Sequence, residues 1–233
     1  MIRQLSSAQE LAEARAKLYR LLSSVYIRPP SPDFLKSLAG WVASLTGAEA
    51  PSQLLSEQMR RSLDMLGSFF EGTEESNSWQ GLAETASVEF TRLFRGVSRH
   101  YSPPPPYESL YREDSGRVFG KLTALVHQEY RRFGLDLAAG LNGEPPDHIS
   151  FELEFMHLLC SQEAEAWKKD DEGEALRLLL AKQDFLREHL MVWLPGFCAK
   201  VKKHDRLGLF GHLADLTEGW VTFDYQQFLK EVE

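Results

Sequence analysis

The segment EPPDHISFELEFMHLLC, residues 144–160, carries the clearest helix signal in the chain. Its two prolines disfavour helix in the residues before them, so a helix should begin just after the pair. Asp147 suits the N-cap, because its carboxylate can accept hydrogen bonds from the free N–H groups of a first turn. His148 then takes the first helical position, and aromatic side chains follow one turn apart at Phe151 and Phe155.

The same helical period recurs outward from this segment in both directions. Apolar residues fall on one stripe between Leu11 and Tyr26, and Pro29 and Pro30 end that helix. No run of alternating β-branched residues indicates a strand. We therefore predict an all-α fold. The other predicted helices cover about 31–46, 53–70, 79–94, 116–133, 147–168, 172–193 and 207–232.

Length and charge limit the kinds of protein that the chain can be. Its 233 residues suffice for one large domain or two small ones, and the composition is uniform along the chain. We predict a single domain, residues 1–233, with an internal hinge-like loop at 134–146. A net charge of −8 argues against nucleic-acid binding, which rests on Lys and Arg against phosphate.

The two cysteines and the N-terminus indicate a cytoplasmic protein. Cys160 and Cys198 lie in apolar helical segments without metal-ligand spacing, which predicts reduced core thiols. The polar N-terminus lacks the apolar run of a signal peptide. No stretch approaches the ~20 apolar residues of a membrane span, so we expect no integral membrane segment.

The familiar catalytic and cofactor motifs are missing. The sequence contains no phosphate-binding loop, dinucleotide-binding glycine pattern, nucleophile elbow or zinc-binding helix motif. Glu154 and His157 form one Glu-x-x-His pair, but a di-iron bundle needs a second copy. His148 and Glu152 supply only two metal ligands. We therefore predict no enzyme, no metal and no cofactor.

The start of the 147–168 helix does suggest a binding surface. Asp147 and His148 stand beside an aromatic stripe and next to a long loop, so they could form one end of an apolar groove with a charged rim. Glu152 lies among apolar residues and adds negative charge. Such a groove suits a ligand that is both basic and hydrophobic, such as an amphipathic helical peptide. Capping alone is the other explanation of Asp147.

The stretch YSPPPPYESLY, residues 101–111, has the composition of a linker but not the setting of one. Helical sequence of similar composition lies on both sides of its four prolines. The prolines more plausibly stiffen a short extended connection that delivers Tyr107, Glu108 and Tyr111 to a fixed place. Ser109 is a candidate cap for the helix that follows.

Four blocks of the sequence carry a family resemblance. They are EFTRLFRG (89–96), PPPPYESLY (103–111), EPPDHISFELEFM (144–156) and FLREHLMVWLPGF (185–197). In this order they resemble the TorD-like cytoplasmic chaperones of molybdoenzymes, which include the DmsD and NarJ types. The resemblance implies a compact all-helical domain of about 9–11 helices.

The resemblance also implies a function. Family members bind the twin-arginine signal peptide, and often the folding body, of a redox enzyme, and retain it until the molybdenum cofactor is inserted before export. The family's Asp-His pair, whose substitution impairs leader binding, is here Asp147 and His148. The loop 134–146 corresponds to a hinge across which some members exchange segments to form homodimers.

The candidate site combines these two lines of inference. Carboxylates should pair with the leader arginines, and aromatic side chains should line the groove, although aromatics at helical spacing are more often core residues. His189 fits either a groove residue or a buried one, whereas Trp193 and Pro195 should close one helix and open the next. The predicted leader-binding residues are Tyr107, Glu108, Ser109, Tyr111, Asp147, His148, Phe151, Glu152 and Phe155.

Two other functions stay open at this point. Some NarJ-type members assemble enzymes that remain in the cytoplasm, which makes a scaffold for a leaderless subunit an alternative. A nucleotide-hydrolysing enzyme is less well supported, because the sequence has no phosphate-binding loop.

Overall fold

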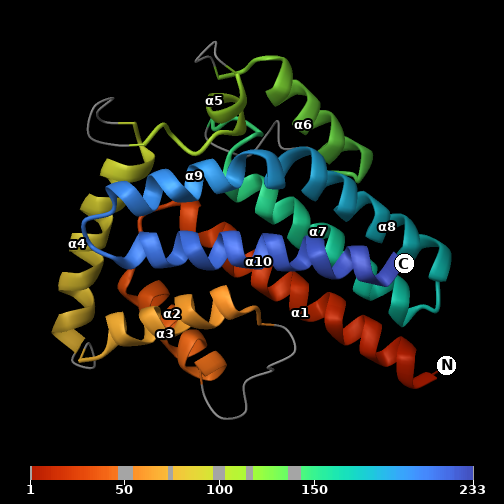
Figure 1. The fold of residues 1–233 in the computed structure, drawn as a ribbon, viewed down its shortest axis with the longest axis horizontal. Helices are drawn as coiled ribbons and strands as arrows, with labels where there is room; N and C mark the ends of the chain where they lie inside the picture. The colour runs from red at the N-terminus through yellow and green to blue at the C-terminus, as the bar shows by residue number, and fades with distance from the viewer. Residues whose placement is uncertain are drawn as a thin grey trace. The chain divides into compact units, whose positions relative to one another are not determined.

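The computed structural model describes residues 2–46, 55–72, 76–96, 103–113, 118–135 and 143–232. Within these ranges the chain forms helices and one isolated β-bridge, so the all-α prediction is confirmed (Figure 1). The helices are α1 (Ile2–Ile27), α2 (Pro32–Thr46), α3 (Glu57–Phe70), α4 (Ser76–Phe94), α5 (Glu108–Arg112), α6 (Lys121–Arg132), α7 (Ile149–Lys168), α8 (Glu172–Phe185), a π-helical turn η2 (Leu186–Leu190), α9 (Met191–His204) and α10 (Leu209–Val232).

The contacts within the chain divide it into two compact units. The first unit comprises Met1–Ile27 and Pro106–Trp193, and the second comprises Arg28–Pro105 and Leu194–Glu233. The single domain predicted from composition stays a prediction. Of the loop predicted as a hinge, residues 136–142 lie outside the described residues.

In the first unit, α7 is the central helix and packs against both α1 and α8 (Figure 1). Its apolar side chains at Leu153, Met156 and Leu159 are fully buried. Glu163 of α7 is buried as well, where it pairs with the buried Lys182 of α8. Because α7 is buried on nearly all sides, the apolar residues of 144–160 occupy more than one face of the helix.

In the second unit, α3 packs against α2 and α10, and α2 packs against α4. The EFTRLFRG block lies in α4. Glu89 accepts hydrogen bonds from Arg92 Nε at 2.8 Å and from the backbone N–H of Arg206 at 2.7 Å. The Arg92 guanidinium also donates to the carbonyl of His204. This block therefore ties α4 to the turn between α9 and α10.

Near Pro195 the observed helices differ from the prediction of one helix over 172–193. The chain stays helical from α8 through η2 into α9, and both Trp193 and Pro195 lie inside α9. The prediction that they close one helix and open the next is wrong. A proline ring crowds the carbonyl four residues before it, here that of Met191. The wider π turn ends directly before that residue.

Both cysteines are buried and neither is in a disulfide, in agreement with the predicted core thiols. Burial raises the pKa of the Cys198 thiol well above its usual range. His157 has its Nδ1 atom 3.0 Å from the carbonyl oxygen of Ala16, which supports the packing interpretation of that histidine. None of the described helices combines the length and apolar character that a membrane crossing requires.

Candidate functional site

The two blocks around 107 and 148 meet in the only β-bridge of the described residues. It is antiparallel and joins Tyr107 to His148. The N–H of Glu108 donates to the carbonyl of Asp147, and the N–H of Ile149 donates to the carbonyl of Pro106, both at 2.9 Å. The proline-rich segment thus delivers the start of α5 to the start of α7, as a stiff connection should.

The caps of α5 and α7 differ from the sequence prediction. Asp147 does not cap its own helix: its Oδ2 accepts from the backbone N–H of Ser109 at 2.9 Å and so caps α5. His148 is the N-cap of α7, with Nδ1 accepting from the N–H of Ser150 at 3.1 Å. Because the bridge holds His148 in an extended conformation, α7 can begin only at Ile149.

Ser109 is not a cap either. It lies inside α5, and its buried hydroxyl finds no hydrogen-bond partner among the described residues. The N-cap of α5 is Tyr107, which makes no side-chain capping bond. The hydroxyl of Tyr107 instead donates to Glu144 Oε2 at 2.5 Å.

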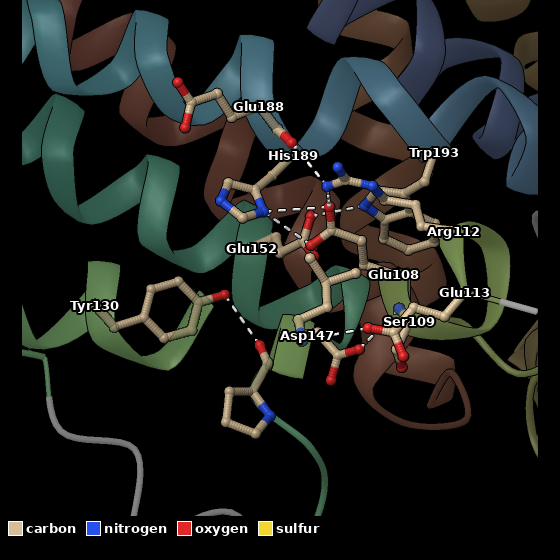
Figure 2. A network of polar contacts seen from close by, with 12 residues as sticks. Glu108, Ser109, Arg112, Glu113, Tyr130, Asp147, Glu152, Glu188, His189 and Trp193 are labelled. Atoms are coloured by element: carbon tan, nitrogen blue, oxygen red, sulfur yellow. Dashed lines mark hydrogen bonds and ion pairs between the residues drawn. The ribbon is translucent and has the colours of Figure 1, made fainter. Parts of the chain in front are cut away.

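A buried carboxylate, Glu108, is the centre of a polar network (Figure 2). It forms an ion pair with Arg112 one turn later in α5. His189 of η2 places Nδ1 2.9 Å from Oε2 and 3.2 Å from Oε1 of the same carboxylate. Arg112 also donates to the carbonyl of Glu188 at 2.8 Å, so Glu108 and Arg112 together attach α5 to the π turn.

Glu152 of α7 lies in the same network and is fully buried. Burial, and next the negative charge of Glu108, raise the pKa of its carboxyl well above the usual range. Its Oε2 accepts from Trp193 Nε1 at 3.0 Å. No donor reaches its Oε1 among the described residues. The raised pKa favours a protonated Glu152 beside the Glu108 carboxylate.

Tyr130 of α6 closes the other side of the network. Its hydroxyl donates to the carbonyl of Pro146 at 3.0 Å, two residues before the α7 N-cap (Figure 2). Burial and the nearby carboxylates raise the pKa of this phenol. Its ring lies 4.8 Å from that of Phe155, between centroids. The start of α7 is therefore fixed from both α5 and α6.

The structure brings the nine predicted site residues together, but mostly inside the protein. Tyr107 and Tyr111 are half-buried, and the Tyr111 ring lies 5.4 Å from that of Trp193. The other seven are buried: Glu108, Ser109, Asp147, His148, Phe151, Glu152 and Phe155. These residues therefore do not form an open groove, and their part in binding stays a prediction.

A cavity of about 440 Å³ lies beside the network, within the first unit. The aromatic rings of Phe133, Phe155 and Phe185 contribute to its wall, and His189 joins them. Phe155 is the one predicted site residue in this wall. The full lining is Glu129, Arg132, Phe133, Phe155, Arg177, Leu180, Ala181, Asp184, Phe185, Glu188 and His189.

Three carboxylates of this lining already have arginine partners in the chain. Glu129 pairs with Arg132 at 2.7 Å, and Asp184 and Glu188 both pair with Arg187, at 2.7 and 2.8 Å. The arginines of these pairs are at least half exposed. Exposed pairs of this kind contribute only about 0–1 kcal/mol, so an incoming cation could replace either arginine.

Sequence reasoning left out several residues that the structure makes central. Arg112 was not selected, although it stands one helical turn after Glu108. His189 and Trp193 belong to the fourth block, but their partners Glu108 and Glu152 are distant in sequence. Phe133 and Phe185 had no signal that separates a cavity wall from a core. Among the described residues, no group of three or more potential metal ligands occurs.

Comparison with known proteins adds an independent observation. Residues 52–199 match the family model described as nitrate reductase delta subunit. The chaperone protein TorD of Vibrio cholerae is 27% identical over 216 residues, covering 92% of this chain and 91% of that protein. The perchlorate reductase assembly chaperone protein of Dechloromonas aromatica is 34% identical over 152 residues, covering 64% and 66% respectively.

A solved structure is also similar to this chain. It comes from Archaeoglobus fulgidus and is described as a candidate redox enzyme maturation protein. The two sequences are 22% identical, and the superposition has a TM-score of 0.48 and covers 87% of this chain and 91% of the other.

Proposed function

This chain belongs to the nitrate reductase delta subunit family and is a redox enzyme maturation chaperone of the TorD type, and we propose that it binds the twin-arginine leader of its molybdoenzyme client. Family membership confirms the resemblance carried by the four sequence blocks. It also confirms the predictions of a cytoplasmic chaperone and of a non-catalytic protein.

The observation that carries the proposal is the composition of the cavity in the first unit. Its wall combines three phenylalanine rings with the carboxylates Glu129, Asp184 and Glu188. A twin-arginine leader has two adjacent guanidinium groups followed by an apolar run. Guanidinium groups pair with carboxylates in bidentate geometry, and an apolar helix lays its side chains against aromatic walls.

The carboxylates can accept these guanidinium groups at low cost. Arg187 lies outside the cavity lining but holds both Asp184 and Glu188. A leader arginine would replace Arg187 at the carboxylate, and Arg187, whose side chain is half exposed, would return to solvent. The gain would come from bidentate hydrogen bonds to the carboxylate and from the apolar contacts of the residues that follow.

The buried residues have a positioning role in this proposal. Asp147, His148 and Glu108 are buried and so are not exposed to the leader, but they hold α5, α7 and the π turn together. His189 links the two parts, because it contacts Glu108 and also lines the cavity. Substitution of the Asp-His pair should therefore weaken binding by displacing the cavity wall.

Calorimetry with a synthetic leader peptide tests the proposal. The variant Asp184→Asn/Glu188→Gln should bind the peptide at least about tenfold more weakly, since each lost charged hydrogen bond costs ~1.5–3 kcal/mol. The matched control is Glu57→Gln/Asp64→Asn, which removes two exposed carboxylates from α3 in the second unit. Equal affinity of the wild type and the cavity variant would contradict the proposal.

A second candidate is an assembly scaffold for a client without a leader. It is favoured by the matched family, described as a reductase delta subunit, and by the relative named as an assembly chaperone. Pull-down of the client with and without its N-terminal segment separates the two functions. Capture that is independent of that segment would favour the scaffold.

A further inference from the structure

We propose that His189 selects arginine over lysine in the bound leader, with its Nε2 atom as a fixed acceptor inside the cavity. The inference rests on the proposed leader binding and adds the residue that determines its specificity. From the sequence alone, His189 could be either a groove residue or a buried one. The inference assigns it a contact with the ligand.

The tautomer of His189 follows from its contact with Glu108. Nδ1 lies within hydrogen-bonding distance of both carboxylate oxygens, at 2.9 and 3.2 Å. A carboxylate only accepts, so Nδ1 must carry a proton. In the neutral ring the other nitrogen, Nε2, then has a free lone pair and is an acceptor.

The second nitrogen is directed away from Glu108 (Figure 2). His189 is part of the cavity lining, together with Phe185 and Glu188. Among the described residues, the hydrogen bonds of the His189 ring involve Nδ1 alone. The lone pair is therefore available to a donor that enters the cavity.

The ring is also held rigidly in place. It stacks on Phe185, with 4.7 Å between centroids and 27° between planes, and its side chain is 8% exposed. Because Arg112 fixes the Glu108 carboxylate from the other side, the acceptor does not need to be ordered when a ligand binds. A preorganised group contributes more to affinity than a mobile one.

Such an acceptor distinguishes guanidinium from ammonium. A guanidinium has five N–H donors in a planar fork, so it can bond to a carboxylate such as Glu188 with one edge and to His189 with another. A lysine ammonium is a compact point charge and pairs with the carboxylates without this geometric requirement. His189 thus adds a contact that favours arginine.

Two substitutions separate the two ends of the ring. In His189→Asn the amide stands near the Nδ1 position, which retains the donor to Glu108 and removes the acceptor in the cavity. In His189→Gln the amide reaches the Nε2 position, which retains an acceptor there. Affinities of the three proteins for a twin-arginine peptide and for its twin-lysine analogue are measured by calorimetry.

We expect His189→Asn to lose about tenfold more affinity for the arginine peptide than for the lysine peptide. His189→Gln should keep most of the preference for arginine. If the wild type binds the arginine peptide and His189→Asn retains the full arginine preference, the inference is wrong and the proposed function stands. If the wild type binds neither peptide, leader binding itself is wrong.

A spectroscopic measurement keeps the inference testable even if these variants fold poorly. Nitrogen chemical shifts of the labelled wild-type protein distinguish the two histidine tautomers and the doubly protonated ring. A neutral His189 with its proton on Nδ1, and a change at Nε2 on addition of the arginine peptide, is the expected result. A proton on Nε2 in the free protein would overturn the inference, because that atom could then not accept.

Discussion

The Oδ2 atom of Asp147 accepts a hydrogen bond from the backbone N–H of Ser109 at 2.9 Å, so the aspartate that precedes α7 caps α5 instead. Together with the bridge between Tyr107 and His148, this bond fastens two sequence blocks to each other. The Asp-His pair is thus a joint between helices in this structure. Under the proposed function, the pair would act on a ligand through the helices that it holds.

Asp147→Ala should destabilise the protein by about 1–3 kcal/mol, because the substitution removes a cap and leaves a buried N–H without an acceptor. Urea unfolding measures this change. Asp147→Asn keeps an oxygen for Ser109 and should lose less.

Ser56→Ala is the control for this capping effect, since Ser56 caps α3 in the second unit through the N–H of Met59. Ser56→Ala should lower stability without lowering the affinity for the leader peptide. If Asp147→Ala were as stable as the wild type, the hydrogen bond between Asp147 and Ser109 would not stabilise the contact between α5 and α7.

Glu152→Gln should change how stability depends on pH. The folded protein raises the pKa of Glu152, so it keeps a proton that the unfolded chain loses above about pH 4.3. Wild-type stability should therefore fall as the pH rises from that value through the folded pKa. Glutamine does not titrate, and its amide can accept from Trp193 and donate to Glu108.

Urea midpoints at pH 5 and pH 8 test this prediction. The variant should gain stability relative to the wild type as the pH rises. The control is Glu154→Gln on the same helix, because the Glu154 carboxylate is paired with Arg20. Parallel pH profiles for the wild type and Glu152→Gln would show that Glu152 is ionised in the folded protein.

Phe133→Ala should weaken leader binding about tenfold, because the peptide would lose part of its apolar contact area. Phe133 is only half-buried, so its loss should affect stability less than a core substitution would. Phe69→Ala is the matched control, since Phe69 is a half-buried phenylalanine of α3 in the second unit. Equal effects of the two variants on affinity would exclude the cavity as the binding site.

Glu89→Ala should cost about 1–3 kcal/mol of stability and leave leader affinity unchanged, because it removes the acceptor of the Arg206 N–H and one acceptor of the Arg92 guanidinium. Burial alone would raise the pKa of Glu89, but the hydrogen bonds from Arg92 and Arg206 outweigh it and lower that pKa. The contribution of Glu89 to the free energy of unfolding is therefore fully present at pH values above the ordinary carboxyl pKa.

That contribution disappears as the pH falls through the lowered pKa of the folded state. The difference in unfolding free energy between the wild type and Glu89→Ala should therefore shrink in acid. Unfolding curves from pH 7 down to pH 3 measure it. A difference that does not depend on pH would refute the charge-assisted contact.

The fold class could be predicted because helical periodicity is a local property of the sequence. The stripe in α1 and the apolar run of α7 were sufficient for that purpose. Helix ends were less predictable where distant residues set them. The bridge to Tyr107 moves the start of α7 to Ile149, and no residue near Ile149 signals that pairing.

The candidate site could be predicted only in part, because the sequence blocks are local patterns whereas contacts between distant residues depend on packing. Sequence blocks identified residues that do cluster, including Glu108 and Asp147, but not that they are buried. The contact between Glu108 and His189 joins residues 81 positions apart, and the cavity rings come from separate helices. Such relations depend on helix packing, which periodicity does not specify.

The π turn between α8 and α9 sets the rotational phase of one helix against the other. In an α-helix each residue advances by about 100° around the axis, whereas a π turn closes its hydrogen bonds over five residues. Phe185, before the turn, lines the cavity, and Trp193, after it, reaches Glu152. The π turn thus keeps the chain helical while it presents Phe185 to the cavity and Trp193 to Glu152.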